Sequence, residues 1–157
     1  MNDDAFVSLP DMIAAHAAQR GDHDAIIQDG RSLSYRELDA AMDRVAAALQ
    51  REGLKPRDTV AICAGTSIEY ACVFLGALRA GVAVAPIAPT STAEGIVTMV
   101  ADSGAKVFFV DKGVSDALSA HLRDLRILAG RRVAADAIDL DAGRGEIANL
   151  RVRETRR

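Results

Sequence analysis

The segment TVAICAGTSIEYACVFLGALRAGVAVAPI (59–87) decides the fold, because it predicts a strand, a helix and a second strand in direct succession. TVAICA (59–64) and VAVAPI (82–87) are continuous apolar runs, which are typical of strands covered on both faces. Gly81 ends the helix between them. AKVFFV (105–110) is a third run of this kind. Strands alternating with helices predict an α/β fold with a parallel βαβαβ core and helices on both faces.

Helix starts in this core carry the capping-box pattern, in which a Ser or Thr and a Glu three residues later cap each other's backbone. Thr66 with Glu69 predicts the start of the first core helix, which runs to about residue 79. Ser91 with Glu94 predicts the start of the second. VSDALSAHLRDLR (114–126) predicts a further helix after the third strand.

A helix and a β-hairpin are predicted before the core. SLPDMIAAHAAQRG (8–21) has Ser8 as a plausible N-cap and a proline in its first turn, where the missing N–H costs nothing. AIIQDGRSLSY (25–35) predicts a hairpin, because Asp29-Gly30 can take the positive φ angles of a two-residue type I′ turn.

LSYRELD (33–39) connects the hairpin to a long amphipathic helix. Ser34 and Glu37 form a capping box at its start, and Gly53 ends it. The spacing of apolar residues predicts one buried stripe along this helix, made of Leu38, Met42, Val45 and Leu49.

Residues 127–157 lack this regular pattern. We therefore divide the chain into an N-terminal α/β subdomain at 1–126 and an irregular Arg-rich tail at 127–157, for which disorder and an out-of-frame reading are the two explanations. IDL (138–140) and NLRV (149–152) are candidate short strands within it. Its arginines raise the alternative of a nucleic-acid-binding arm, which the five interleaved acids disfavour.

Composition and charge exclude several classes of protein. The net charge of −3 gives no general attraction to nucleic acid or anionic lipid. MNDDAF (1–6) is acidic where a secretory signal is basic, and the longest apolar run, YACVFLGAL (70–78), is too short to span a bilayer. We therefore expect a cytoplasmic protein with no membrane span. Cys63 and Cys72 lie in apolar runs, which predicts buried free thiols.

A search for catalytic motifs finds no P-loop, no G-x-G-x-x-G fingerprint and no G-x-S-x-G elbow in the sequence. His16, His23 and His121 lie on separate predicted elements without metal-ligand spacing, so a helix-surface or loop position is the favoured interpretation of each. Cys63 is interpreted as an inert core thiol. We therefore assign no catalytic, cofactor-binding or metal-binding residue.

Functional potential lies instead at the carboxyl ends of the predicted parallel strands, where ligands of open α/β sheets bind. These ends are Gly65-Thr66-Ser67, Ala88-Pro89-Thr90 and Asp111-Lys112-Gly113. The first could bind an anion at a helix N-terminus, but helix capping explains it equally well and is favoured. Lys112 could reach a phosphate, and a solvated loop lysine is the commoner case.

The order of several sequence motifs resembles the N-terminal part of the adenylate-forming superfamily, the AMP-dependent acyl-CoA synthetases and ligases. The resemblance covers residues 8–112 and differs at three positions: Arg57 replaces a usual glycine, and Thr66 and Ala88 each replace a common asparagine. The matching motifs are LSYRELD (33–39), GLKPRDTVAI (53–62), TSIEY (66–70), LGALRAGVAVAPIAPT (75–90) and VADSGAKVFFV (100–110).

The resemblance implies an enzyme that uses ATP and Mg²⁺ to convert a carboxylic acid to an acyl-adenylate, which a thiol such as coenzyme A then attacks. Bacterial fatty-acid and aryl-acid CoA ligases are the most similar members. The family's Thr/Ser/Gly-rich phosphate loop ending in Pro-Lys-Gly and its catalytic lysine have no counterpart here, so no family catalytic residue maps onto this sequence. ATP, Mg²⁺ and coenzyme A are accordingly implied only for full-length members.

Three interpretations stay open from the sequence. The first is an N-terminal fragment of an acyl-CoA synthetase that is inactive alone and associates with the remainder of the enzyme, or with itself through an exposed sheet surface. The second is a non-catalytic interaction module. The third is a small nucleotide-binding α/β domain that uses the loop at 65–67.

Overall fold

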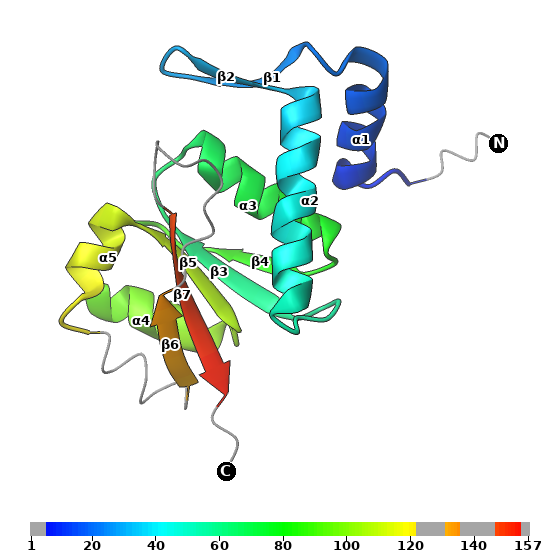
Figure 1. Ribbon diagram of the computed structural model, residues 1–157. Coiled ribbons are helices and arrows are strands. Elements are labelled where there is room, and N and C mark those ends of the chain that lie inside the picture. Colours follow the sequence, from blue (N-terminus) through cyan, green and yellow to red (C-terminus); the bar gives the residue numbers. More distant parts are fainter. Residues whose placement is uncertain (1–5, 122–130, 136–146, 155–157) are drawn as a thin grey trace.

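A computed structural model describes residues 6–121, 131–135 and 147–154 of the chain (Figure 1). The described elements follow one another along the chain in this order: α1 (Leu9–Arg20), β1 (Asp24–Gln28), β2 (Arg31–Ser34), α2 (Tyr35–Arg51), β3 (Thr59–Cys63), α3 (Ile68–Arg79), β4 (Ala83–Pro86), α4 (Ala93–Asp102), β5 (Val107–Asp111), α5 (Lys112–Leu118), β6 (Arg131–Ala135) and β7 (Ile147–Glu154).

The central sheet has the strand order β4-β3-β5-β7-β6. β3 pairs in parallel with both β4 and β5, so Ile62 lies beside Pro86 on one side and Phe109 on the other. This part confirms the predicted parallel βαβαβ core. β7 then adds antiparallel to β5, and β6 antiparallel to β7.

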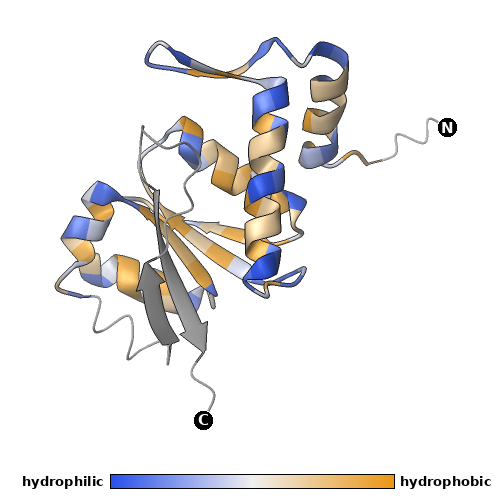
Figure 2. Ribbon diagram, viewed as in Figure 1, coloured by the Kyte–Doolittle hydropathy of each residue, from blue (hydrophilic) through white to orange (hydrophobic). Residues whose placement is uncertain are grey.

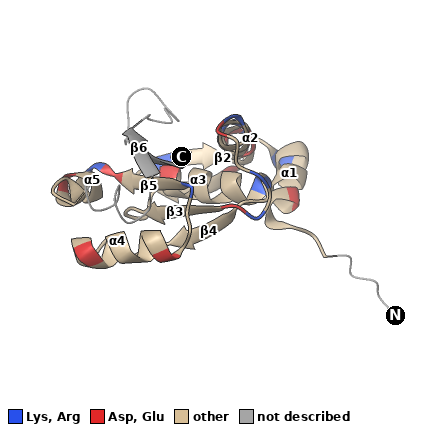
Figure 3. Cartoon of the chain, turned by 90° about the horizontal axis from the view of Figure 1, so that it is seen from below, with Lys and Arg blue, Asp and Glu red and all other residues tan. Residues whose placement is uncertain are grey.

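Helices cover both faces of the sheet, as predicted. Alternate residues of each central strand point to opposite faces, so Val60 and Phe109 pack with α2 and α3, whereas Ala61 and Phe108 pack with α4 and α5. Figure 3 shows α4 on one side of the strands and α2 on the other. Figure 2 shows the central strands as largely hydrophobic.

The elements before the core form a third packed group beside α2 and α3. Ile13 of α1 and Leu38 of α2 are buried in one cluster with Ile68 and Cys72 of α3, against which Ile26 of the hairpin packs. Ser8 caps α1 as predicted, accepting from the Asp11 N–H. This group holds the hairpin against the N-terminal end of α3.

The predicted hairpin and long helix are confirmed in detail. Asp29 and Gly30 have φ angles of 49° and 76°, as a type I′ turn requires. The Ser34 hydroxyl accepts from the Glu37 N–H, and the Glu37 carboxylate accepts from the Ser34 N–H, which completes the capping box. Leu38, Met42, Val45 and Leu49 are all buried.

Two helix caps differ from the prediction by one residue. Ser67, not Thr66, caps α3 by accepting from the Tyr70 N–H, and Thr92, not Ser91, caps α4 by accepting from the Gly95 N–H. In the first pattern the Glu69 carboxylate pairs with Arg31 of the hairpin and so does not complete a capping box.

Arg57 has an unusual backbone conformation. Arg57 has a φ angle of 73°, in the left-handed region that favours glycine. Its N–H donates to the Gly81 carbonyl (2.8 Å), and Gly81 itself has a φ of 71°. Arg57 is therefore a non-glycine residue in a strained conformation.

The C-terminal predictions are tested only in part. α5 occupies Lys112–Leu118, earlier than the helix predicted at 114–126, because Asp111 caps it by accepting from the Val114 N–H. NLRV (149–152) lies within β7, which confirms a strand there. IDL (138–140) and residues 122–130 lie outside the described residues.

Candidate functional site

The three predicted strand-end loops meet around one cavity of about 300 Å³. Gly65 follows β3, Pro89 and Ser91 follow β4, and Asp111 ends β5. Its remaining walls come from α4 and α5: Ala93, Ile96, Gly113, Val114 and Ala117. The parallel topology therefore brings together the loops that the sequence placed at one edge of the sheet.

Asp111 is the charged residue of this cavity, and both of its oxygens bind backbone. Oδ2 accepts from the Gly65 N–H (2.8 Å), and Oδ1 accepts from the Val114 N–H (2.8 Å). One carboxylate thus holds the loop after β3 and caps α5. A carboxylate here also disfavours a second anion, because two like charges at close range repel.

Several backbone groups in and just after the loop at 65–67 have hydrogen-bond partners within the protein. The side chain of Gln28, from the hairpin, donates through Nε2 to the Thr66 carbonyl (2.9 Å) and accepts through Oε1 from the Ile68 N–H (3.1 Å). Ser67 Oγ accepts from the Tyr70 N–H (3.0 Å). These contacts support the capping interpretation of the loop over anion binding.

Lys112 lies in the first turn of α5, where its ammonium forms an ion pair with Asp116 Oδ2 (3.0 Å). Both side chains are largely exposed, so the pair is solvated and contributes little to stability. The prediction of a solvated lysine is therefore the one that the structure supports, with the correction that the residue is helical.

The two cysteines are buried free thiols, as predicted. Burial, with a smaller contribution from the Asp111 carboxylate, raises the pKa of Cys63 to about 11. Burial and the Glu69 carboxylate raise the pKa of Cys72 to about 11 as well, against a small opposing effect of Arg44. Since the thiolate is the reactive form, neither side chain is suited to act as a nucleophile at neutral pH.

The histidines are distributed as predicted. His16 is on α1, where its ring lies 5.0 Å from that of Tyr35, and His23 is in the turn before β1. His121 follows α5. Across residues 6–121 and the described strands of the tail, no three His, Cys, Asp or Glu side chains gather as metal ligands do.

One partly buried ion pair was missed by the sequence reasoning. Glu69 is 7% exposed and its Oε1 lies 2.6 Å from Arg31 Nη2. The two residues are 38 positions apart, so no local pattern could reveal them. The pair fixes the hairpin on α3 together with Gln28.

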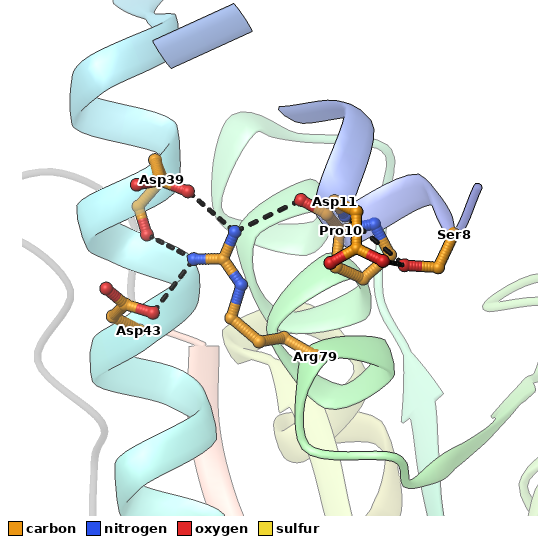
Figure 4. A network of polar contacts seen from close by, with 6 residues as sticks. All are labelled: Ser8, Pro10, Asp11, Asp39, Asp43 and Arg79. Atoms are coloured by element: carbon orange, nitrogen blue, oxygen red, sulfur yellow. Dashed lines mark hydrogen bonds and ion pairs between the residues drawn. The ribbon is translucent and has the colours of Figure 1, made fainter. Parts of the chain in front are cut away.

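A second polar network joins three helices through Arg79 (Figure 4). The guanidinium lies 2.6 Å from Asp39 Oδ1 and 2.9 Å from Asp43 Oδ1, and it donates to the carbonyls of Asp39 (2.9 Å) and Pro10 (3.3 Å). α3 is thereby bound to α2 and to the start of α1. A separate cavity of about 330 Å³ lies beside this network, and Asp11 is among its lining residues.

No helix in the part of the chain that the structure describes has the length and apolar character needed to span a bilayer.

Comparison with known proteins identifies the family. Polyketide synthase PksN of Bacillus subtilis (strain 168) is 34% identical over 129 residues, and phosphinothricin tripeptide synthetase PhsB of Streptomyces viridochromogenes is 39% identical over 101 residues. The matches cover 82% and 64% of this chain but only 2% and 8% of the respective relatives. The chain thus spans only a small part of the length of these curated relatives.

Among solved structures, the Mycobacterium tuberculosis fatty acyl CoA synthetase is 25% identical, with a TM-score of 0.68 over 73% of this chain and 23% of that protein. The similarity therefore extends to proteins named as a polyketide synthase and a tripeptide synthetase as well as to an acyl-CoA synthetase. The sequence model for the AMP-binding enzyme family matches residues 13–150, which includes β7 up to Leu150. The chain belongs to the family of AMP-binding enzymes, the adenylate-forming superfamily that its motifs resemble.

Proposed function

We propose that this chain is the N-terminal scaffold subdomain of an ATP-dependent enzyme that activates a carboxylic acid as an acyl-adenylate, and that it does not catalyse the reaction alone. A carboxylate is a poor electrophile, and joining it to AMP supplies a good leaving group for attack by a thiol such as coenzyme A. The observation that carries the proposal is that the family match spans residues 13–150, whereas the sequence contains no Pro-Lys-Gly phosphate loop.

The geometry of the strand-end cavity supports a scaffold role. Asp111 and Gln28 already bind two of the backbone N–H groups at the loop after β3, those of Gly65 and Ile68. In this arrangement the loop positions elements of the protein against one another. The occupied N–H groups and the nearby Asp111 carboxylate disfavour the third interpretation, a nucleotide site at 65–67, and we expect calorimetric titration of the chain with ATP and with AMP to show no binding.

ATP–pyrophosphate exchange tests the proposal directly. The purified chain is assayed with Mg²⁺, labelled pyrophosphate and separate panels of fatty, aromatic and amino acids. These panels are chosen because the relatives include a fatty acyl CoA synthetase and a tripeptide synthetase, and because the motifs also resemble aryl-acid CoA ligases. We expect no exchange above the enzyme-free control. Exchange that depends on one acid would refute the scaffold proposal and identify the substrate at the same time.

The partner in this proposal is the remainder of a synthetase, in a cytoplasmic enzyme. Translation of the flanking DNA in all reading frames should show a Pro-Lys-Gly phosphate loop, and the polypeptide that carries it should restore exchange when it is co-expressed with this chain. If no frame encodes such a loop, the chain acts without the remainder and the interaction-module interpretation replaces this one.

A further inference from the structure

The outward side of α1 and the residues just before it form an unusually apolar protein surface. Phe6 is 95% exposed and Met12 is 46% exposed. Asp11 is the only charged residue among the exposed positions of 6–19, and Arg20, the next residue, lies over the Tyr35 ring. The exposed positions are Phe6, Val7, Leu9, Asp11, Met12, Ala14, Ala15, Ala18 and Gln19.

Contacts within the described residues use only one side of α1. Ile13 is its single buried residue, although apolar side chains continue around the helix. Figure 3 shows α1 at the rim of the protein, beyond α2, so its outward side faces away from the sheet.

Beside this side of α1 lies an acidic groove, the cavity of about 330 Å³ described above. It is lined by three carboxylates, those of Asp11, Asp39 and Asp43, against the one guanidinium of Arg79. Asp43 keeps 69% of its side chain exposed despite its ion pair with Arg79. The groove therefore has an excess of accessible negative charge next to apolar surface.

We propose that the α1 surface, defined as exposed Phe6, Leu9 and Met12 together with the acidic groove, docks a protein segment that carries apolar and basic side chains. Apolar contact supplies the driving force, and basic side chains complement the carboxylates. A second copy of the chain would bring the same acids together in a symmetric interface, and an anionic lipid surface would repel them. Charge therefore selects a basic protein partner over both.

Two labelled helical peptides, one of leucine and lysine and one of leucine and glutamate, test the proposal by fluorescence anisotropy with the full chain. We expect the lysine peptide to bind, more weakly as salt is raised, and the glutamate peptide not to bind. In a Met12→Ser, Leu9→Ser double variant the Kd for the lysine peptide should rise about tenfold, which corresponds to about 1.4 kcal/mol of lost apolar contact.

Met99→Ser is the matched control, because Met99 is 39% exposed on α4, which covers the other face of the sheet, and its loss should leave binding unchanged. Circular dichroism confirms that each variant folds. The proposal is wrong if neither peptide binds, if both bind equally, or if the α1 variant binds like wild type. It is also wrong if that variant abolishes a dimer in sedimentation or binding to phosphatidylcholine–phosphatidylglycerol vesicles.

The α1 surface shares no residue with the strand-end cavity. A negative peptide result therefore leaves the acid-activation proposal intact, and acid-dependent pyrophosphate exchange by the chain alone leaves the docking proposal intact.

Discussion

Replacing Gly76 by alanine should destabilise the protein by about 1 kcal/mol, because Gly76 lies where α3 packs directly against α2. A Cβ at this position would lie 2.5 Å from Val45 Cβ, 2.7 Å from Val45 Cγ1 and 3.1 Å from the Met42 carbonyl oxygen. Carbon atoms pack best at about 3.5–4.0 Å, so the two helices must move apart. Such overpacking costs about 1–3 kcal/mol. Alanine recovers about 1 kcal/mol through its better helix propensity, which leaves the net loss stated.

Urea unfolding followed by circular dichroism measures this effect as a lower midpoint at an unchanged slope. Gly113→Ala is the matched control, because it also adds a Cβ to a helical glycine, but the nearest atom is Asp111 Oδ1 at 3.5 Å, an ordinary contact. The control should be as stable as wild type or slightly more stable. A Gly76→Ala protein at least as stable as wild type would show that the α2–α3 contact is looser than these distances require.

Three other predictions follow from single residues. Cys63 and Cys72 should react with a thiol reagent only after denaturation, since burial raises the pKa of each to about 11; rapid labelling of the native protein would contradict this. The hydrogen bond from Lys106 lowers the folded-state pKa of Asp58 below its unfolded value, so Asp58 should contribute stability that is lost as the pH falls below about 4. The free energy of unfolding, measured against pH for the wild type and for Asp58→Asn, should show this loss in the wild type only. Arg57→Gly should raise the unfolding midpoint by relieving a φ of 73°, whereas Arg57→Ala keeps the Cβ and should leave the midpoint unchanged; equal behaviour of the two variants would exclude backbone strain.

The sheet and its helices were predictable because they depend on local patterns. Continuous apolar runs are typical of strands covered on both faces. The runs at 59–64, 82–87 and 105–110 contain β3, β4 and β5. The antiparallel extension by β7 was only partly visible, because a strand from outside the βαβ repeat chooses its neighbour through non-local pairing with β5.

The caps and the site show where local patterns are insufficient. The pattern at Thr66 offered a complete capping box, but Arg31 binds the carboxylate of Glu69 and Gln28 binds the backbone on both sides of the actual cap, Ser67. All of these partners come from the hairpin, about 40 residues earlier. The meeting of the strand-end loops followed from parallel topology, whereas the two backbone contacts of Asp111 could be found only in three dimensions.

Because Asp111 serves two loops at once, the lengths of those loops are coupled. Gly65 and Asp111 are 46 positions apart, and an insertion beside Gly65 would break their contact, whereas an insertion between Asp111 and Val114 would remove the cap of α5. The hairpin tip has no such restriction, since a side chain on Gly30 would meet no atom within 4 Å. Natural length variation in this part of the family should therefore collect at the hairpin tip, and the strand-end loops should keep a constant number of residues.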